Sequence, residues 1–138
     1  MTPAQARQRF SAAVVARLAT IGPDGAPHLV PVTFAVEGDT IVTAVDAKPK
    51  RGGRLRRLAN VSANPRVALL VDEYDNDWDR LWWARADGVA RIAGAGAEQD
   101  SAFALLRERY PQYASVALVG PVVVVAVLRW SGWSATDG

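Results

Sequence analysis

Residues 121–130 read PVVVVAVLRW, and this run decides the fold class. Valine is β-branched and favours strands, and an almost uninterrupted apolar run is typical of a strand buried on both faces. A second subunit over the outer face would account for that burial. Six strands in total are expected along the chain, and closing them into an antiparallel barrel would remove the exposed edges that such apolar strands present. The chain is therefore predicted to be mainly β, with few helices.

The N-terminal part predicts one helix followed by three strands. Pro3 near the start favours a helix over 3–13, and the following residues favour a strand over 14–21. A Pro-Asp-Gly turn leads to a β-branched and aromatic run at 28–36, and a second short turn leads to 40–46. Three antiparallel strands joined by short turns predict a meander.

The C-terminal part alternates strands with two more helices. A helix follows the glycine pair at 52–53 and ends before Asn64, and a second helix covers 98–110 and ends at Pro111. Two strand segments lie between these helices. They are expected at 66–74 and at 80–93, the latter a candidate for a long strand pair that is broken or bulged near Asp87–Gly88.

Length and composition bound the class of protein. The length fits a single domain over residues 1–138. Half of the residues are hydrophobic, but no apolar run reaches the roughly 18 to 20 residues that a membrane span needs. The N-terminal MTPAQARQRF lacks the apolar core of a signal peptide. A cytoplasmic protein without a membrane span is predicted.

The residue types exclude several kinds of chemistry. The sequence has no cysteine and one histidine, His28. Disulfides, thiolate metal sites and cysteine nucleophiles are thereby excluded, and one chain cannot supply a multi-histidine metal site. His28 lies beside a turn and receives no catalytic role. We expect the chemistry to come from a bound molecule.

Basic charge is concentrated in residues 48–57, KPKRGGRLRR, which hold six of the sixteen Lys and Arg residues. The remainder of the chain has ten basic residues against fourteen acidic ones. Glycines that allow close approach, a helix N-terminus and guanidinium groups all favour a phosphate. A solvated basic loop is an equally good interpretation of this stretch alone. A charge this local does not favour nucleic acid.

Asp75, Asp77 and Asp79 alternate like the start of a calcium-binding loop. Such a loop needs a glycine at its sixth position and a carboxylate at its twelfth, where this chain has Arg80 and Ala86. We therefore predict no metal site. A solvated acidic loop, or one paired with Arg80 and Arg85, is the preferred interpretation.

Two pairs of tryptophans are candidates for a ligand or an interface. Trp82 and Trp83 are neighbours and point to opposite faces of a strand, so one packs inside and the other is free for a partner or a ligand. Trp130 and Trp133 follow the most apolar strand and are placed to edge a ring-shaped cofactor, with core or dimer packing as the alternative.

Several motifs occur in a shared order: DGAPHLVPVTF, KPK, RRLANVSANPRVALLVD, RLWWARADG, ERYPQY and VVVVAVLRWSGW. Together they resemble the pyridoxamine 5'-phosphate oxidase-like split-barrel proteins, and most closely their F-420-dependent oxidoreductase subgroup. The resemblance implies a six-stranded antiparallel split β-barrel that forms a homodimer. It also implies a flavin or deazaflavin bound in two equivalent grooves at the subunit interface.

The resemblance assigns the basic stretch to cofactor binding. Arg57 stands eight positions before the proline of the NP pair, where relatives carry a phosphate-binding basic residue, and Arg56 precedes it. Asn60 lies on the same segment, and Lys48 and Lys50 fall where further anion contacts would arise.

The ring of the cofactor is assigned to other segments. Pro31, Val32 and Thr33 resemble the version of the family in which mainly backbone groups meet the ring, and Trp130 matches a tryptophan that approaches the cofactor. The basic residues that pyridoxamine oxidases carry around the HLVPVTF strand and near the C-terminus do not occur here. Oxidation of pyridoxamine phosphate is therefore not expected.

The resemblance implies an enzyme in which reduced F-420 passes a hydride to a small hydrophobic acceptor. The protein would position the cofactor and exclude water, so no side chain is named as catalytic. An FMN-binding oxidoreductase of the same fold is one alternative. A non-catalytic carrier of F-420 or flavin is another.

Overall fold

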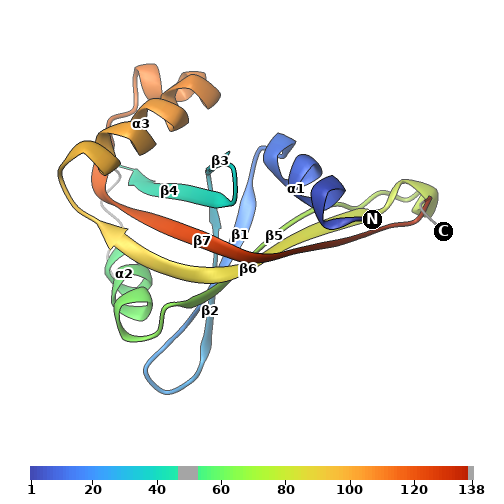
Figure 1. Ribbon diagram of the computed structural model, residues 1–138, viewed down its shortest axis with the longest axis horizontal. Coiled ribbons are helices and arrows are strands. Elements are labelled where there is room, and N and C mark those ends of the chain that lie inside the picture. The colour runs from blue at the N-terminus through green and yellow to red at the C-terminus, as the bar shows by residue number, and fades with distance from the viewer. Residues whose placement is uncertain (47–52, 137–138) are drawn as a thin grey trace.

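The computed structural model describes residues 1–46 and 53–136 (Figure 1). Helices and strands follow in the order α1 (Pro3–Ala12), β1 (Ala16–Ile21), β2 (Pro27–Val32), β3 (Ala35–Glu37), β4 (Thr40–Asp46), α2 (Gly53–Ala63), β5 (Arg66–Glu73), η1 (Trp78–Arg80), β6 (Trp82–Ala93), α3 (Ala97–Arg109), η2 (Pro111–Ala114) and β7 (Leu118–Ser134). The prediction of a mainly β protein is confirmed.

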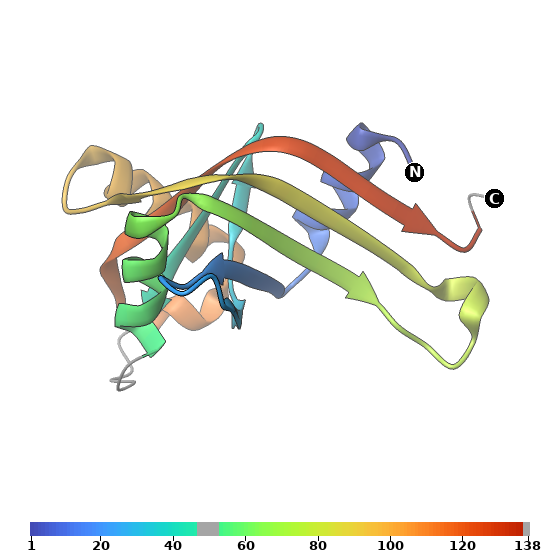
Figure 2. The same ribbon diagram turned by 90° about the horizontal axis from the view of Figure 1, so that it is seen from below.

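One antiparallel sheet of seven strands has the order β2-β1-β5-β6-β7-β4-β3. The strands β2 and β3 are its two edges, yet only Thr33 and Phe34 separate them along the chain. Two residues span less than about 10 Å, so the sheet curls until its edges nearly meet. The result is an incomplete barrel, in which β5, β6 and β7 continue side by side as a long arm (Figure 2).

The predicted number of six strands is wrong because the run at 28–36 forms two strands. Its first part pairs with β1 and its last part pairs with β4. The two hairpins of the predicted meander are therefore confirmed, but its middle strand is divided, and β2 and β3 lie at opposite edges of the sheet. Pro31 lies on an edge strand, as its missing N–H requires.

Burial on both faces is confirmed for Val122–Val125 of β7, but its cause is not a second subunit. Val123 and Val125 pack into the barrel interior, while Val122 and Val124 pack under α3. Phe103 and Leu106 are the main side chains that α3 lays on this part of the sheet. A second subunit was predicted to cover the outer face of β7, but α3 of the same chain covers it (Figure 1).

The barrel interior is closed by α1 on one side and α2 on the other. Phe10 of α1 is fully buried, and its ring lies 4.9 Å from that of Phe34 and 5.3 Å from that of Trp130. Val61 is the buried contact of α2. The helix α1 starts with a capping box in which the Thr2 hydroxyl accepts from the N–H of Gln5.

The predicted irregularity at Asp87–Gly88 is confirmed as a register shift within one continuous strand, β6. A Cβ at Gly88 would lie 2.3 Å from the carbonyl oxygen of Ala126, which is closer than side chains come. Glycine is required here because β7 approaches so tightly.

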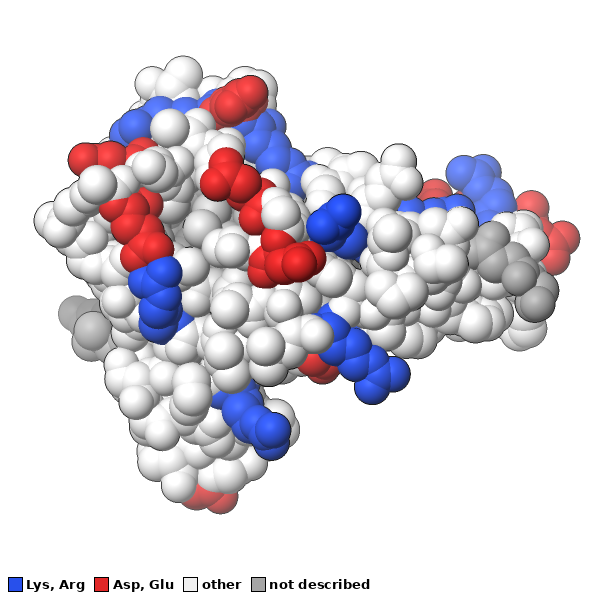
Figure 3. Space-filling view, viewed as in Figure 1, with Lys and Arg blue, Asp and Glu red and all other residues white. Residues whose placement is uncertain are grey.

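Basic and acidic side chains are interspersed on the face shown in Figure 3. Within residues 1–46 and 53–136, no helix is both long and apolar enough to cross a membrane.

Candidate functional site

The outer face of the sheet carries a groove built from two hollows. Their volumes are about 460 and 430 Å³, and they share Leu70, Asp72 and Arg85, so they form one continuous depression. This depression runs from β2 across β1 and β5 to the arm of β6 and β7. We call it the outer groove.

Strand alternation determines which side chains line the outer groove. The register aligns one row of residues across five strands, namely Pro31, Arg17, Leu70, Arg85 and Ser131. Residues paired across antiparallel strands share a face, so this row lies opposite the buried core. Pro31, which was predicted to meet the cofactor, therefore stands at one end of the row.

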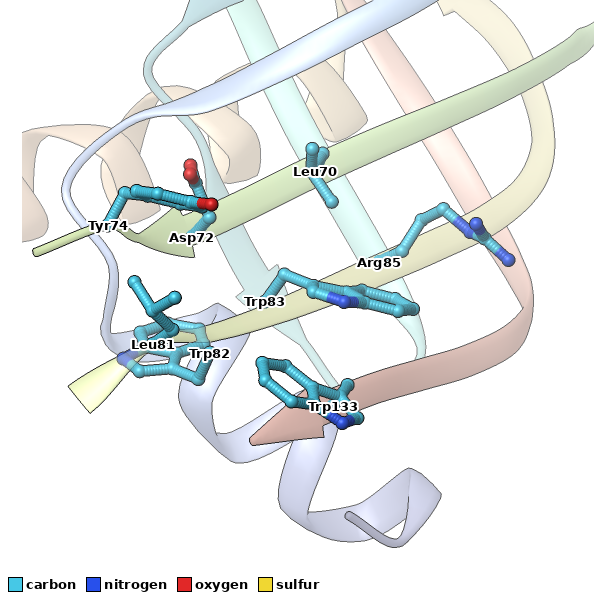
Figure 4. Close-up of a pocket in the computed structure, with 8 residues that line it drawn as sticks. All are labelled: Leu70, Asp72, Tyr74, Leu81, Trp82, Trp83, Arg85 and Trp133. Atoms are coloured by element: carbon cyan, nitrogen blue, oxygen red, sulfur yellow. The ribbon is translucent and has the colours of Figure 1, made fainter. Parts of the chain in front are cut away.

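The part of the outer groove on the arm is aromatic (Figure 4). Its lining residues are Leu70, Asp72, Tyr74, Leu81, Trp82, Trp83, Arg85 and Trp133. Trp83 and Trp133 are cross-strand partners, and the Arg85 guanidinium lies 5.5 Å from the centre of the Trp83 ring. Both neighbouring tryptophans line this hollow, and Trp82 also packs against the core, so the predicted division between them is only partial.

Few polar groups accompany these rings. Arg85 donates to Asp87 at 2.9 Å, which leaves both side chains about 40% exposed. The hydroxyl oxygen of Ser131 is buried and has no hydrogen-bond partner among the described residues. An unmatched buried hydroxyl costs free energy, but Ser131 lines neither hollow of the outer groove.

The crossover between the sheet edges, Thr33–Phe34, lies next to Pro31 and is held by side chains instead of a strand partner. The Phe34 N–H donates to the Tyr110 hydroxyl at 3.1 Å, and Arg109 donates to the Phe34 carbonyl at 3.1 Å. The Thr43 hydroxyl donates to the Thr33 carbonyl at 2.7 Å. These bonds satisfy backbone groups that a sheet would otherwise pair.

Tyr110 is the central residue of this arrangement. Its hydroxyl lies 2.8 Å from the carbonyl oxygen of Val14 and 3.0 Å from that of Phe34, so it can donate a hydrogen bond to either carbonyl. Burial raises the pKa of Tyr110 above its ordinary value, against the opposing hydrogen bond to the Phe34 backbone. The phenol therefore remains protonated at neutral pH and can donate.

The predicted phosphate residues lie on α2, away from the aromatic part of the groove. Arg56 is exposed and Arg57 is half-buried. Asn60 is 3% exposed and donates from its amide to the Thr20 hydroxyl at 3.0 Å, which ties α2 to the inner face of β1. Their role in holding a phosphate stays a prediction. The other two predicted residues, Lys48 and Lys50, lie outside the described residues.

Two more predicted cofactor residues have buried side chains. Val32 is 5% exposed and Trp130 is 8% exposed, and both belong to the interior core. The Trp130 indole N–H donates to Asp39 at 2.9 Å. Pro31 stands at the end of the row on the outer face, and Thr33 lies in the crossover against Tyr113. Val32 and Trp130 face the interior, where Trp130 lies beside Phe10.

The acidic loop is folded on itself. The Asp75 carboxylate accepts from the N–H of Asp77 at 2.8 Å, and the Asp77 carboxylate accepts from the N–H of Asp79 at 3.1 Å. Arg80 pairs with Glu73 at 3.6 Å. In the described part of the chain, no three His, Cys, Asp or Glu side chains gather as metal ligands would.

Sequence reasoning missed the residues that hold the crossover. Arg109, Tyr110 and Tyr113 lie about 75 to 80 positions after the segment that they contact, and nothing in local periodicity connects the two. Their only sequence signal was the ERYPQY motif, which occurs in the family resemblance.

A curled antiparallel sheet with a groove on its outer face is the class of fold observed. The sequence matches the family described as Pyridoxamine 5'-phosphate oxidase over residues 2–134, so the chain belongs to that family. A 5a,11a-dehydrotetracycline/5a,11a-dehydrooxytetracycline reductase of Streptomyces rimosus is 40% identical over 57 residues. That match spans 41% of this chain and only 39% of the reductase.

Solved structures are similar over nearly the whole chain. A conserved hypothetical protein of Mycobacterium tuberculosis is 26% identical, with 99% of this chain and 87% of that one covered and a TM-score of 0.76. A FAD-binding protein of Mesorhizobium loti is 20% identical over 96% and 92% of the two chains, with a TM-score of 0.69. A FAD-binding protein of Mycobacterium smegmatis is 21% identical over 96% and 93%, with a TM-score of 0.62.

Proposed function

We propose that this protein is an F-420-dependent reductase that works as a homodimer on a small, planar, hydrophobic acceptor. The observation that carries the proposal is the outer groove, an apolar and aromatic depression that runs from Leu29 on β2 to Trp133 on β7 in a chain of this family. The partial similarity to a reductase supports the direction of the reaction.

The residues of the groove fit a flat cofactor with a polar edge. Cofactor sites are mostly apolar with a small number of placed polar groups. The groove has that character, because Leu70, Trp83 and Trp133 provide apolar surface while Arg85 provides hydrogen-bond donors.

When bound, reduced F-420 would supply a hydride to the acceptor. This chain's own part is binding, orientation and exclusion of water. Arg56 and Arg57, with Lys48 and Lys50, would hold the phosphate and the acidic tail. The backbone of Pro31–Thr33 would meet the ring.

A second copy of the chain would complete the groove. Leu29 and Trp133 are 65% and 48% exposed, and Leu70 is 38% exposed, all on the same face of the sheet. Contiguous exposed apolar surface of this kind marks an interface or a ligand site. A homodimer formed over this face would enclose the ring and the acceptor between two subunits.

A flavin is the second candidate cofactor. Two of the similar solved structures are described as FAD-binding proteins, and an FMN-dependent oxidoreductase would use the same groove. A carrier that binds F-420 or flavin without turnover is the remaining alternative.

Titration of the purified protein with F-420 and, separately, with FMN tests the proposal. Quenching of tryptophan fluorescence reports binding, because Trp83 and Trp133 line the groove. Micromolar binding of F-420 is expected. Binding of FMN but not of F-420 would favour a flavin-dependent oxidoreductase. Binding of neither cofactor would contradict the proposed function. Binding without oxidation of reduced F-420 by any planar acceptor would indicate a carrier.

Replacing Arg57 with Ala tests the phosphate site. Loss of one charge-assisted hydrogen bond should weaken F-420 binding roughly tenfold to a hundredfold. Arg107→Ala on α3 is the matched control, because it removes one positive charge at the far side of the sheet. Equal affinity in both variants would contradict the assignment of Arg57.

A further inference from the structure

The half of the outer groove that lies on the arm is a hollow of about 460 Å³, which we call the arm hollow. Strand register places three of its residues in one row, because Asp72 of β5 pairs with Trp83 of β6, and Trp83 pairs with Trp133 of β7. Figure 4 shows the Tyr74 ring and Asp72 on one side of the hollow and the rings of Trp83 and Trp133 on the other. A hollow of this size is large enough for a small organic molecule.

Asp72 is the charged group of the arm hollow that no neighbour neutralises. Its carboxylate makes no ion pair or hydrogen bond among the described residues. The other charged side chain that lines the hollow, Arg85, donates to Asp87 at 2.9 Å. Glu73, next to Asp72 in the chain, pairs with Arg80 at 3.6 Å. The uncompensated charge in the arm hollow is therefore negative.

The aromatic rings of the arm hollow attract the opposite sign of charge. The face of an aromatic ring binds cations through its quadrupole. The chain itself shows this preference, because the Arg85 guanidinium lies 5.5 Å from the centre of the Trp83 ring. Within residues 1–46 and 53–136, the rings of Tyr74 and Trp133 have no cation over them. They are available to a cation that enters the hollow from solvent.

Loss of water from Asp72 makes the hollow selective. Asp72 is exposed in the free chain, so water solvates its carboxylate. A ligand in the arm hollow would displace part of that water. A carboxylate that loses water without gaining a partner costs free energy, whereas a cationic group on the ligand replaces the lost water. A neutral ligand of the same shape is therefore disfavoured, and an anionic ligand is disfavoured more strongly.

The second hollow of the outer groove differs in its lining. It has a volume of about 430 Å³, is lined by Arg17 and Leu29 among others, and has no aromatic side chain. Arg17 makes no ion pair with Asp72 within the described part of the chain. A ligand in the arm hollow would leave this second hollow open, so the outer groove has room for two molecules.

We propose that the arm hollow binds a flat organic cation, that is, an aromatic ring system with a protonated amine. Its rings would lie against Trp83, Trp133 and Tyr74, and its amine would pair with Asp72. The inference deepens the proposed function and rests on it for one point, namely that this cation is the hydride acceptor. The binding step itself requires neither F-420 nor turnover.

Three probes with one ring system and three different charges test the sign of the site. They are 2-naphthylmethylamine, which is protonated at neutral pH, the neutral 2-naphthylmethanol and the anionic 2-naphthoate. Isothermal titration calorimetry of the cofactor-free protein at pH 7 measures each dissociation constant. The amine should bind about tenfold more tightly than the alcohol, and the alcohol more tightly than the naphthoate. Added salt should reduce the advantage of the amine.

The variant Asp72→Asn separates charge from shape. It retains the size of the side chain, so it should remove the tenfold preference for the amine and leave the affinity for the alcohol unchanged. Asp100→Asn is the matched control, because Asp100 is exposed on α3, and it should change no affinity. Trp83→Leu should weaken binding of the amine and of the alcohol about threefold to tenfold each, because it removes a ring and no charge. A purely structural role of Asp72 would alter the affinities for the amine and the alcohol equally.

The inference and the proposed function can fail separately. Equal affinities for the amine and the alcohol, tightest binding of the naphthoate, or no binding of any probe would overturn the inference. A preference for the amine that survives Asp72→Asn would also overturn it. None of these results concerns F-420 binding, so the proposed function would stand. Selective binding of the amine by a protein that binds neither F-420 nor FMN would support the site and contradict its role as an acceptor site.

Discussion

The two faces of the same strands differ sharply in chemistry. On β6, Ala84 and Ala86 are fully buried against the interior, while Trp83 and Arg85, which alternate with them, face the outer groove. The inner face is covered by α1 and α2, and within residues 1–46 and 53–136 the outer face is covered where α3 lies on β4 and β7. The sheet therefore has one face devoted to stability and one face that is partly left for a partner or a ligand.

The difference separates two kinds of substitution. A change on the inner face should alter folding, because packing there is complete and cavities cost free energy. A change in the outer groove should alter binding or assembly while the chain stays folded. Each prediction below measures how far that separation holds, from the largest effect to the smallest.

Replacing Phe34 with Ala should have the largest effect. Phe34 is fully buried, and its ring contacts Phe10 and the Arg109 guanidinium. The free energy of unfolding should fall by about 3 to 5 kcal/mol, measured by urea denaturation. Leu29→Ala on the outer face, 65% exposed, should change it by less than about 0.5 kcal/mol at the same low protein concentration. Equal losses of unfolding free energy in the two variants would show that the two faces do not differ in their contribution to stability.

Replacing Trp133 with Asp should disrupt assembly instead of folding. A large aromatic residue in an interface groove commonly contributes at least about 2 kcal/mol, which is roughly thirtyfold in a dissociation constant. Sedimentation at several concentrations measures the change, and the circular dichroism spectrum should remain that of the wild type. Trp78→Asp is the control, because Trp78 is 71% exposed on η1 and lines neither hollow. A dimer that survives Trp133→Asp would place the interface elsewhere.

Replacing Tyr110 with Phe should cost about 1 to 3 kcal/mol in unfolding free energy, because the Phe34 N–H is left without its acceptor. The effect depends on pH. The pKa of Tyr110 is raised by burial, so its contribution is complete below the ordinary pKa of tyrosine and is lost as pH rises through the higher pKa of the folded state.

Urea midpoints of both proteins between pH 7 and strongly alkaline pH test this sign. The advantage of the wild type over Tyr110→Phe should shrink above roughly pH 10. A constant difference over the whole range would show that Tyr110 does not titrate in the way that its burial requires.

Much of the fold was predictable because its causes are local. The valines of β7, the Pro-Asp-Gly turn and the Asn64–Pro65 stop act within a few residues, and the elements they predict are present. The division of 28–36 into two strands was not predictable in this way. Thr33 and Phe34 are ordinary strand residues by type, but side chains take their backbone bonds. Tyr110 and Arg109, some 75 residues later, bond the backbone of Phe34, and Thr43 bonds the carbonyl of Thr33.

The candidate site was predictable only in part. Family motifs led to Pro31 and Thr33; Pro31 stands at the end of the row on the outer face, and Thr33 lies in the crossover against Tyr113. The groove itself depends on register across five strands, which brings Arg17, Leu70 and Arg85 into one row. Register depends on which strands pair and how they align, and the sequence of one strand does not show which strands lie beside it.

The smallest effect is expected for the ion pair that joins the outer face to α3. Arg91 of β6 donates to Glu98 of α3, and the two side chains are 61% and 47% exposed. The pair lowers the pKa of Glu98, so any stabilisation it gives is present above the ordinary pKa of glutamate and is lost as pH falls. Water and salt screen such a pair strongly.

Glu98→Gln should therefore leave the melting temperature at pH 7 almost unchanged, whereas Leu106→Ala on the same helix should lower it markedly. Leu106 is a fully buried residue of α3, while the Arg91–Glu98 pair is exposed at the edge of the contact between α3 and the sheet. If Glu98→Gln destabilised the protein as much as Leu106→Ala, charge and not apolar packing would hold α3 on the sheet. In that case α3 would be attached to the outer face by the ion pair, and its buried side chains would not act as part of the core.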